Sequence, residues 1–245
     1  MKPELNFGDL TKSMITDIPA NLHTNEASEI KKTILRFPEE AVYIYSFEEN
    51  RMLYADGWEA VLGYKDDEIN MLKIISCSVP EYAPFSNELN DKAMQFIMGK
   101  KKNLEQYSFS IELKKIHKNG TEVPLLVRVG VYKSEKGRVV SIIGRFTITR
   151  SLRFGKVMRY ACYGAGKNEF EKELNKSLFY HLAISDKERD ALAMAANGLS
   201  FKEIAHKLKV STSAIEKRIN PLYKRFDVKS LTHLVNFAKD NHIID

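Results

Sequence analysis

Residues 185–226 read SDKERDALAMAANGLSFKEIAHKLKVSTSAIEKRINPLYKRF, and they predict three short helices joined by tight turns. The first two helices begin with the same signature, a serine followed three residues later by a glutamate. Ser185 precedes Glu188, and Ser200 precedes Glu203. Each pair predicts a capping box, in which the serine and glutamate side chains bind backbone N–H groups at the start of a helix. The stretch therefore predicts closely spaced helices with defined starting points.

The third predicted helix starts near residues 211–213, after a tight turn at Lys209-Val210, and it has two faces. Its apolar face carries Ile215, Ile219, Leu222 and Phe226, and its polar face carries Ser213, Glu216, Lys217, Asn220 and Lys224. We expect the apolar face to pack on a small core while the polar face lies in the major groove of DNA, which admits a helix. Any amphipathic surface helix has two faces, but two short capped helices joined by a tight turn are much less common.

Hydroxyl groups and basic side chains surround this polar face. The hydroxyls near the helix start and its free N–H groups suit phosphates, and Lys202 and Arg218 flank the surface. The candidate DNA-binding residues are Ser200, Lys202, Ser211, Thr212, Ser213, Glu216, Lys217, Arg218, Asn220 and Lys224.

The pattern from Ser185-x-x-Glu188-Arg189 to Lys224-Arg225-Phe226-x-Val228 resembles the LuxR/FixJ-type (GerE-like) helix-turn-helix over about 65 residues. The resemblance implies a four-helix domain whose third helix enters the major groove, with Glu216, Lys217 and Asn220 facing the bases. It also implies dimerisation, usually through the fourth helix, here residues 230–241.

The sequence departs from the family pattern at four positions. Ala214 stands where the family commonly has threonine, and Arg218 where it commonly has histidine. Pro221 lies inside the third helix, where it removes the hydrogen bond to the carbonyl of Lys217, so we expect a kink or an early end to the straight part. Glu216 replaces a frequent lysine, and its carboxylate repels phosphates unless it accepts from cytosine. We therefore expect unusual specificity.

Residues 37–150 predict an antiparallel sheet with helices on one side, an α+β layout. Strands are expected at residues 41–47, 51–55, 106–118, 121–132 and 138–149, with the helical pieces, including residues 88–98, between the second and third strands. Alternating apolar residues Phe109, Ile111 and Leu113, with Ile116, mark the third strand. Lys118-Asn119-Gly120 predicts the turn of a hairpin.

This segment resembles a PAS domain of the type found in sensor proteins. The resemblance rests on Tyr43-Ile-Tyr, Leu53-Tyr-Ala-Asp56, Leu62-Gly63-Tyr64, Lys118-Asn-Gly120 and Gly144-Arg-Phe-Thr147. It implies a five-stranded sheet whose short helices enclose a pocket for a ligand.

No cofactor is predicted for this pocket. Residues 88–100 contain no histidine that could bind haem, and Cys77 does not lie in the motif of a flavin photosensor. Cys77 is expected to be an ordinary small buried residue, and His117 a surface residue. An unidentified small organic ligand and no ligand both remain open, and without one the domain would serve dimerisation and protein contacts.

The chain is thus expected to have four parts. Residues 1–36 form an N-terminal extension with a helix at 26–36 capped by Asn25, and residues 37–150 form the PAS-like domain. Residues 151–176 form a linker, and residues 177–245 form an all-α four-helix domain. Leucine and phenylalanine recur every fourth residue from Phe170 to Leu182, which predicts a helix that docks on its own domain or forms a coil between subunits.

Charge is divided unevenly along the chain. The net charge is +6, of which residues 1–149 carry −1 and residues 150–245 carry +7. A basic half beside a neutral half indicates an anionic partner for the basic half, although a solvated basic surface has the same composition. The chain has no apolar run of the ~20 residues that a membrane helix needs, no signal-peptide pattern and only two cysteines. We therefore expect a cytoplasmic protein without a membrane partner.

These patterns predict a DNA-binding transcription regulator, as a homodimer, in which the PAS-like domain senses a signal or mediates dimerisation. The alternative is a protein-interaction module whose helix-turn-helix contacts RNA polymerase or another partner instead of double-stranded DNA. An enzyme is disfavoured because the sequence has no P-loop, no G-x-S-x-G, no Gly-rich dinucleotide loop and no histidine–carboxylate cluster.

Overall fold

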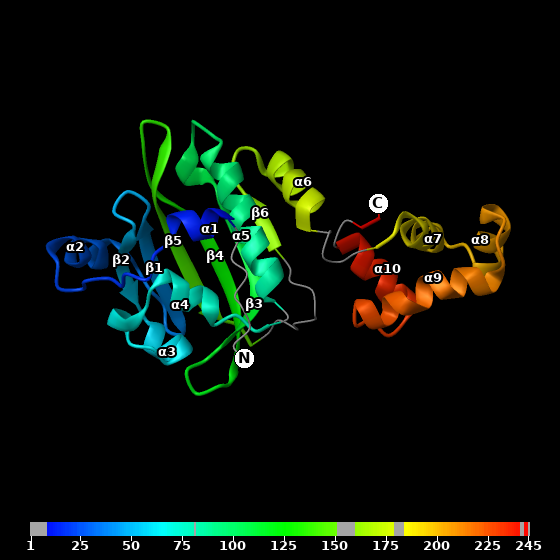
Figure 1. Ribbon diagram of the computed structural model, residues 1–245, viewed down its shortest axis with the longest axis horizontal. Coiled ribbons are helices and arrows are strands. Elements are labelled where there is room, and N and C mark those ends of the chain that lie inside the picture. Colours follow the sequence, from blue (N-terminus) through cyan, green and yellow to red (C-terminus); the bar gives the residue numbers. More distant parts are fainter. Residues whose placement is uncertain (1–8, 81, 151–159, 179–183, 241–242, 245) are drawn as a thin grey trace. The chain divides into compact units, whose positions relative to one another are not determined.

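The computed structural model describes most of the chain (Figure 1). The described residues are 9–80, 82–150, 160–178, 184–240 and 243–244. They divide into two compact units, with the division after Leu174. No helix among the described residues is long and apolar enough to cross a membrane.

The N-terminal unit is built on one antiparallel sheet with the strand order β2-β1-β5-β4-β3-β6. The strands are β1 (Glu40–Ser46), β2 (Arg51–Asp56), β3 (Ser108–Ile116), β4 (Glu122–Glu135), β5 (Arg138–Ile148) and β6 (Tyr160–Tyr163). The predicted turn joins β3 to β4, and Gly120 adopts the left-handed conformation there, at a φ of +89°. The predicted antiparallel sheet and α+β class are confirmed.

β6 makes the sheet six-stranded, whereas five strands were predicted. It pairs with β3 from Ser108 opposite Tyr163 to Ile111 opposite Tyr160. The strand lies within residues 151–176, where the sequence predicts a linker. Its four residues, Tyr-Ala-Cys-Tyr, are all apolar and do not alternate with polar residues, so the sequence alone does not identify a strand.

Helices surround this sheet, some packing on it directly and others on α5 (Figure 1). They are α1 (Asp9–Met14), α2 (Asn25–Thr33), α3 (Trp58–Leu62), η1 (Asp66–Glu68), α4 (Met71–Ser76), α5 (Ala83–Met98), η2 (Leu104–Gln106) and α6 (Lys167–Leu178). The cap of α2 is Thr24, whose side chain accepts a hydrogen bond from the N–H of Ala27, and not the predicted Asn25. α5 starts before the predicted Glu88 because Pro84 is favourable in the first turn of a helix.

Helices cover both faces of the sheet at β1, and not one face as predicted. Tyr43 points to the side on which α4 and α5 lie, and it lines a cavity with residues of both helices. The next residue, Ile44, points to the opposite side, where it packs with Ala27 and Ile30 of α2. Every residue of β1 is consequently buried.

α6 docks on the N-terminal unit through the first part of the predicted apolar stripe. Phe170 and Leu174 are completely buried. The ring of Phe170 stacks on that of Phe96 in α5, with the ring centroids 4.4 Å apart and the planes 1° from parallel. The side chain of Leu178 and the whole of Leu182 lie outside the described residues.

Beyond the end of α6, the described residues of the C-terminal unit form four helices, as predicted. They are α7 (Asp186–Ala196), α8 (Phe201–Leu208), α9 (Thr212–Arg225) and α10 (Leu231–Asp240). One apolar core joins all four. Its completely buried members are Ala191, Leu192, Ile204, Ile215, Ile219, Leu222, Leu234 and Ala238.

Candidate DNA-binding surface and internal cavity

Both predicted capping boxes are present. At α7, the backbone N–H of Ser185 donates to Oε2 of Glu188 over 2.7 Å, and the N–H of Glu188 donates to Oγ of Ser185 over 3.3 Å. At α8, Ser200 and Glu203 repeat the arrangement at 2.8 and 3.3 Å. Hydrogen bonds from Ser200 lower the pKa of Glu203, so its carboxylate is ionised as the cap requires. The local sequence therefore sets where both helices begin.

A short turn orients α9 after α8. Lys209 adopts the left-handed conformation, at a φ of +51°, and its N–H closes the end of α8 by donating to the carbonyl of His206. Ser211 then caps α9, because its Oγ accepts a hydrogen bond from the N–H of Ala214 over 3.2 Å. The tight turn predicted at Lys209-Val210 is confirmed.

The two faces of α9 are separated as predicted. Ile215, Ile219 and Leu222 are completely buried, and Phe226, which ends the helix, is 3% exposed. The exposed residues of α9 include Thr212, Ser213, Glu216, Lys217, Asn220, Pro221 and Lys224. The helix therefore leaves a polar face of mainly Ser, Lys, Asn and Glu side chains free for a partner.

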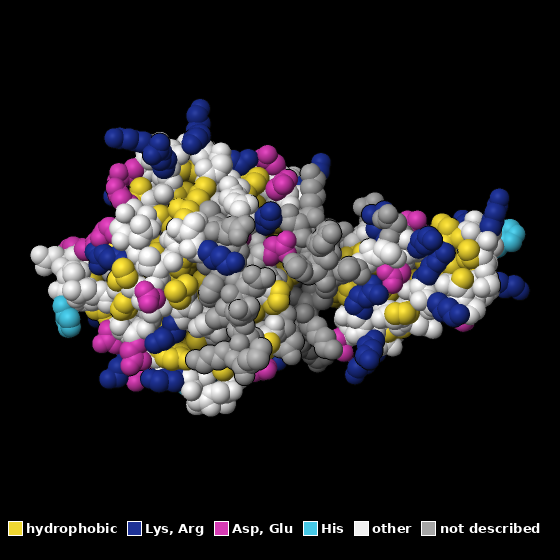
Figure 2. Space-filling model, in the orientation of Figure 1, with side chains coloured by type: hydrophobic (Ala, Val, Ile, Leu, Met, Phe, Trp, Pro, Cys, Tyr) yellow, Lys and Arg dark blue, Asp and Glu magenta, His cyan; other side chains and the backbone are white. Residues whose placement is uncertain are grey.

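Of the remaining candidate residues, Ser200, Lys202 and Ser211 lie at the starts of α8 and α9, and Arg218 lies in the middle of α9. Ser200, Lys202 and Ser211 are exposed, and Arg218 is half-buried. The hydroxyls of Ser200 and Ser211 already take part in helix caps. Figure 2 shows many Lys and Arg side chains on the visible face of this unit. The sequence-predicted residues thus lie on the two helices of the helix-turn-helix, but two of the hydroxyls have a structural role as well.

Arg225 holds the beginning of α7 to the end of α9. Its Nη1 and Nη2 donate to the two carboxylate oxygens of Glu188 over 3.2 and 3.1 Å. Burial opposes the ionisation of Glu188, but hydrogen bonds from Arg225 and Ser185 outweigh it and lower the pKa. The sequence predicts Glu188 only as a cap, because no local pattern connects residues this far apart in the chain.

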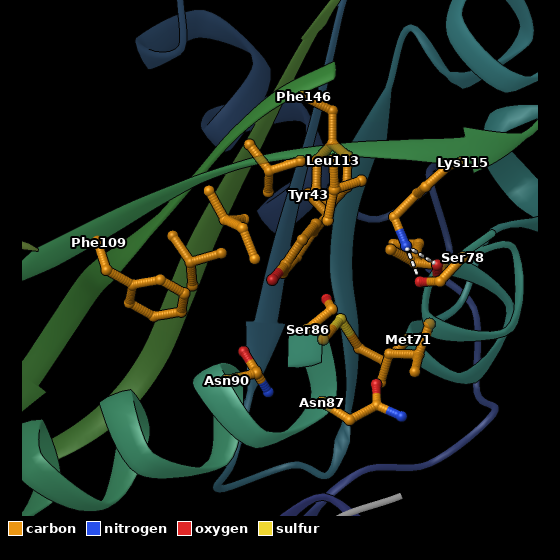
Figure 3. A pocket seen from close by; sticks show the side chains of 15 residues that line it. Tyr43, Met71, Ser78, Ser86, Asn87, Asn90, Phe109, Leu113, Lys115 and Phe146 are labelled. Atoms are coloured by element: carbon orange, nitrogen blue, oxygen red, sulfur yellow. Dashed lines mark hydrogen bonds between the residues drawn. The ribbon is translucent and has the colours of Figure 1, made fainter. Parts of the chain in front are cut away.

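The N-terminal unit has a partly open cavity of about 60 Å³ between the sheet and helices α4 and α5 (Figure 3). Strands β1, β3, β4 and β5 supply a mainly apolar wall that includes Phe109, Leu113 and Phe146. Ser86, Asn87 and Asn90 of α5 line the opposite side. The described residues that line the cavity include no histidine or cysteine, which are the usual ligands of haem iron.

Lys115 lies at one end of this cavity and is the residue that sequence reasoning missed. It is 3% exposed, and its Nζ donates to the carbonyl of Ile74 over 2.5 Å and to Oγ of Ser78 over 2.9 Å. Both acceptors are neutral, and no carboxylate of the described residues lies within 4 Å of the ammonium. Burial lowers its pKa to about 8. The cavity therefore has an uncompensated cationic end.

Tyr43 supplies a second polar group. Its side chain extends from β1 toward α5 (Figure 3), and its hydroxyl has no hydrogen-bond partner among the described residues. Burial raises the pKa of this hydroxyl well above its ordinary value, so it remains a proton donor. An ammonium and a phenol in a mainly apolar chamber suit a small molecule that carries hydrogen-bond acceptors.

Comparisons with known proteins bear on the C-terminal unit. The family described as bacterial regulatory proteins, luxR family, matches residues 182–238. No curated protein matches the chain.

Several solved structures resemble the chain weakly. VqmA of Vibrio cholerae, described as a dimer in the absence of its target DNA, is 13% identical, with 91% of this chain and 90% of that chain covered and a TM-score of 0.35. A phage VqmA in complex with DPO is 14% identical, with 89% and 88% covered and a TM-score of 0.36. The PAS domain of a Colwellia psychrerythraea protein is 12% identical, with 50% and 97% covered and a TM-score of 0.38.

The family match covers all of α7, α8 and α9 and most of α10. It starts before the first capping box and includes the whole two-faced third helix. The described part of residues 182–238 therefore contains a helix-turn-helix, and this segment matches the luxR family of bacterial regulatory proteins.

Proposed function

We propose that the chain is a transcription regulator that binds double-stranded DNA through α9 and responds to a small molecule in the cavity of its N-terminal unit. The observation that carries the DNA-binding part is the exposed polar face of α9, opposite the buried Ile215, Ile219 and Leu222. A helix presented in this way fits the major groove.

Different side chains would make different kinds of contact. Glu216, Lys217 and Asn220 face the bases, where lysine donates to guanine, asparagine pairs with adenine and glutamate accepts from cytosine. The hydroxyls and free N–H groups at the start of α9 bind phosphate oxygens. Lys202, Arg218 and Lys224 add sequence-independent attraction to the phosphate backbone.

The test is a gel-shift assay of the full chain with genomic duplex fragments at several salt concentrations. We expect sequence-selective binding that weakens as salt rises, because phosphate contacts release counterions. Lys217→Ala should weaken this binding, whereas the matched control Lys187→Ala, at an exposed lysine of α7, should not. Binding to purified RNA polymerase without selective DNA binding would favour the alternative, a protein-interaction module.

The cavity supports the sensing part of the proposal. Its volume of about 60 Å³ admits a molecule of only a few heavy atoms without rearrangement. The uncompensated ammonium of Lys115 and the free hydroxyl of Tyr43 favour a ligand that carries an anionic or strongly accepting group on an apolar body.

Native mass spectrometry of the purified full chain tests this part. We expect an additional small mass that is released on denaturation, that is lost in Lys115→Met and that is retained in the exposed-lysine control Lys102→Met. A wild-type chain that carries no small molecule, and gains none from a metabolite extract, would contradict sensing and favour a dimerisation and protein-contact role.

The regulator is further proposed to act as a homodimer, as the family resemblance implies for the fourth helix. In the described chain, α10 buries Leu234 and Ala238 and leaves Leu231 and Val235 half-buried. Light scattering coupled to size exclusion should give twice the mass of 28.1 kDa, and a monomer at micromolar concentration would refute this proposal.

A further inference from the structure

Pro221 interrupts the hydrogen-bond ladder of α9. In a regular helix the N–H of residue 221 would donate to the carbonyl of residue 217, but proline has no N–H. The helix nevertheless continues through Pro221 to Arg225. The carbonyl oxygen of Lys217 therefore lacks the donor that a regular helix supplies to each interior carbonyl.

The missing bond lies on the exposed side of the helix. Lys217 and Pro221 are both exposed and one turn apart, so they share a face, whereas Ile219 and Leu222 are buried. The proline ring also crowds the carbonyl one turn before it, and carbonyls on the solvent side of a helix tilt outward. We therefore expect the Lys217 oxygen to tilt toward the exposed face that carries Lys217 and Asn220.

Packing in the core does not explain why position 221 is a proline. Pro221 contributes no side chain to the buried core, whose members on α9 are Ile215, Ile219, Leu222 and, at its end, Phe226. Proline is the costliest residue in a helix interior, and an exposed position accepts almost any other residue. The loss of helix stability is explained if the freed carbonyl of Lys217 binds a partner.

We propose that the main-chain carbonyl of Lys217 is an acceptor that reads one base in the major groove. Only adenine N6 and cytosine N4 present donors there, whereas guanine and thymine present acceptors at the same edge. A carbonyl at this place selects adenine or cytosine and repels the other two bases. This inference rests on the proposed DNA binding by α9, and it adds a specificity determinant that no side chain provides.

In the first experiment, the full-length wild type and the full-length Pro221→Ala variant each select the sequences they bind from a pool of random DNA duplexes, and the two selected motifs are compared. Pro221→Ala restores the N–H and closes the helical bond to Lys217, and it does not endanger folding because alanine favours a helix. The wild type should prefer adenine or cytosine at one position of the selected motif. We expect the variant to lose this preference and to keep the rest of the motif. An unchanged motif, or a loss spread over all positions, would overturn the inference.

The second experiment removes the base amine instead. At the affected position, adenine is replaced by unsubstituted purine, which lacks the 6-amino group, or cytosine by pyrimidin-2-one, which lacks the 4-amino group. The affinity for each duplex is then measured for the wild type and for Pro221→Ala. The loss of one hydrogen bond should weaken the wild type roughly fivefold, whereas Pro221→Ala should not discriminate. If removing the base amine weakens the wild type but not Asn220→Ala or Glu216→Ala, the amine binds that side chain, and the proposal is refuted.

The outcomes separate the two levels of inference. A wild type that selects no sequence contradicts DNA binding itself, and the carbonyl role falls with it. A wild type that selects a motif which Pro221→Ala reproduces supports DNA binding and refutes only the role of the carbonyl.

Discussion

Lys115 offers the sharpest physical test of the N-terminal unit. Its pKa in the folded chain is lowered by burial to about 8, from the ordinary lysine value of 10.5. A shift of this size corresponds to about 3 kcal/mol, because each pKa unit is worth about 1.4 kcal/mol. Replacing the ammonium by the uncharged, similarly long methionine removes this penalty but also removes two hydrogen bonds of a charged donor, worth about 1.5–3 kcal/mol each.

The direction of the pH dependence follows from proton binding. Below pH 8 both the folded and the unfolded chain hold the proton, and the penalty is fully present. Between about pH 8 and 10.5 the folded chain has released the proton while the unfolded chain still binds it, so the wild type gains stability by about 1.4 kcal/mol per pH unit. Relative to the wild type, Lys115→Met should therefore lose about 3 kcal/mol of stability between pH 8 and pH 10 and none below pH 8.

Trp58 makes the measurement specific to the right part of the chain. It is the single tryptophan, it is completely buried, and it packs on Phe146, which lines the same cavity. Urea unfolding followed by its fluorescence at pH 7, 8, 9 and 10 gives the free energy of unfolding of this unit. Lys102→Met is the matched control at an exposed lysine. A difference between Lys115→Met and wild type that stays constant from pH 7 to 10 would show that Lys115 is not desolvated.

Three further changes test the C-terminal unit and α6. Lys217→Ala should weaken DNA binding by about tenfold and relax the specificity at one base pair, with the melting temperature unchanged; normal operator affinity would remove Lys217 from the DNA surface. Ile219→Asp places a charge in the core and should unfold the C-terminal unit while the Trp58 transition persists; unchanged helical circular dichroism would refute the buried assignment. Phe170→Ala removes the stack on Phe96, at a cost of roughly 3 kcal/mol, and hydrogen exchange should lose protection in α6; protection equal to wild type would mean that other contacts hold this helix.

The helix-turn-helix could be predicted almost entirely because its determinants are local. The capping boxes at Ser185 and Ser200 each span four residues, and the period of α9 is visible within one helix. What the sequence could not provide was the pair between Glu188 and Arg225, since two residues far apart in the chain meet only after the helices have packed.

The sheet was predicted less completely because its signals depend on pairing. Four apolar residues at β6 become a strand only beside β3. Phe109, Ile111, Leu113 and Lys115 all line the cavity, so Lys115 continues the inward alternation of β3. The apolar pattern directed attention to Ile116, whereas the strict period of two already placed a lysine on the inward face. A charged residue at an inward position was the signal that could have revealed the cavity.

Lys115 and Pro221 each lower the stability of the fold, and this supports a role in binding for both residues. A buried ammonium without a carboxylate partner among the described residues and a proline inside a helix each cost about 3 kcal/mol. A protein is only about 5–15 kcal/mol more stable than its unfolded chain, so neither cost is negligible. Departures from local consistency are expected where a chain binds something. Lys115 faces the cavity and Pro221 lies on the exposed face of α9, which are the two places where the proposed ligand and the proposed DNA would bind.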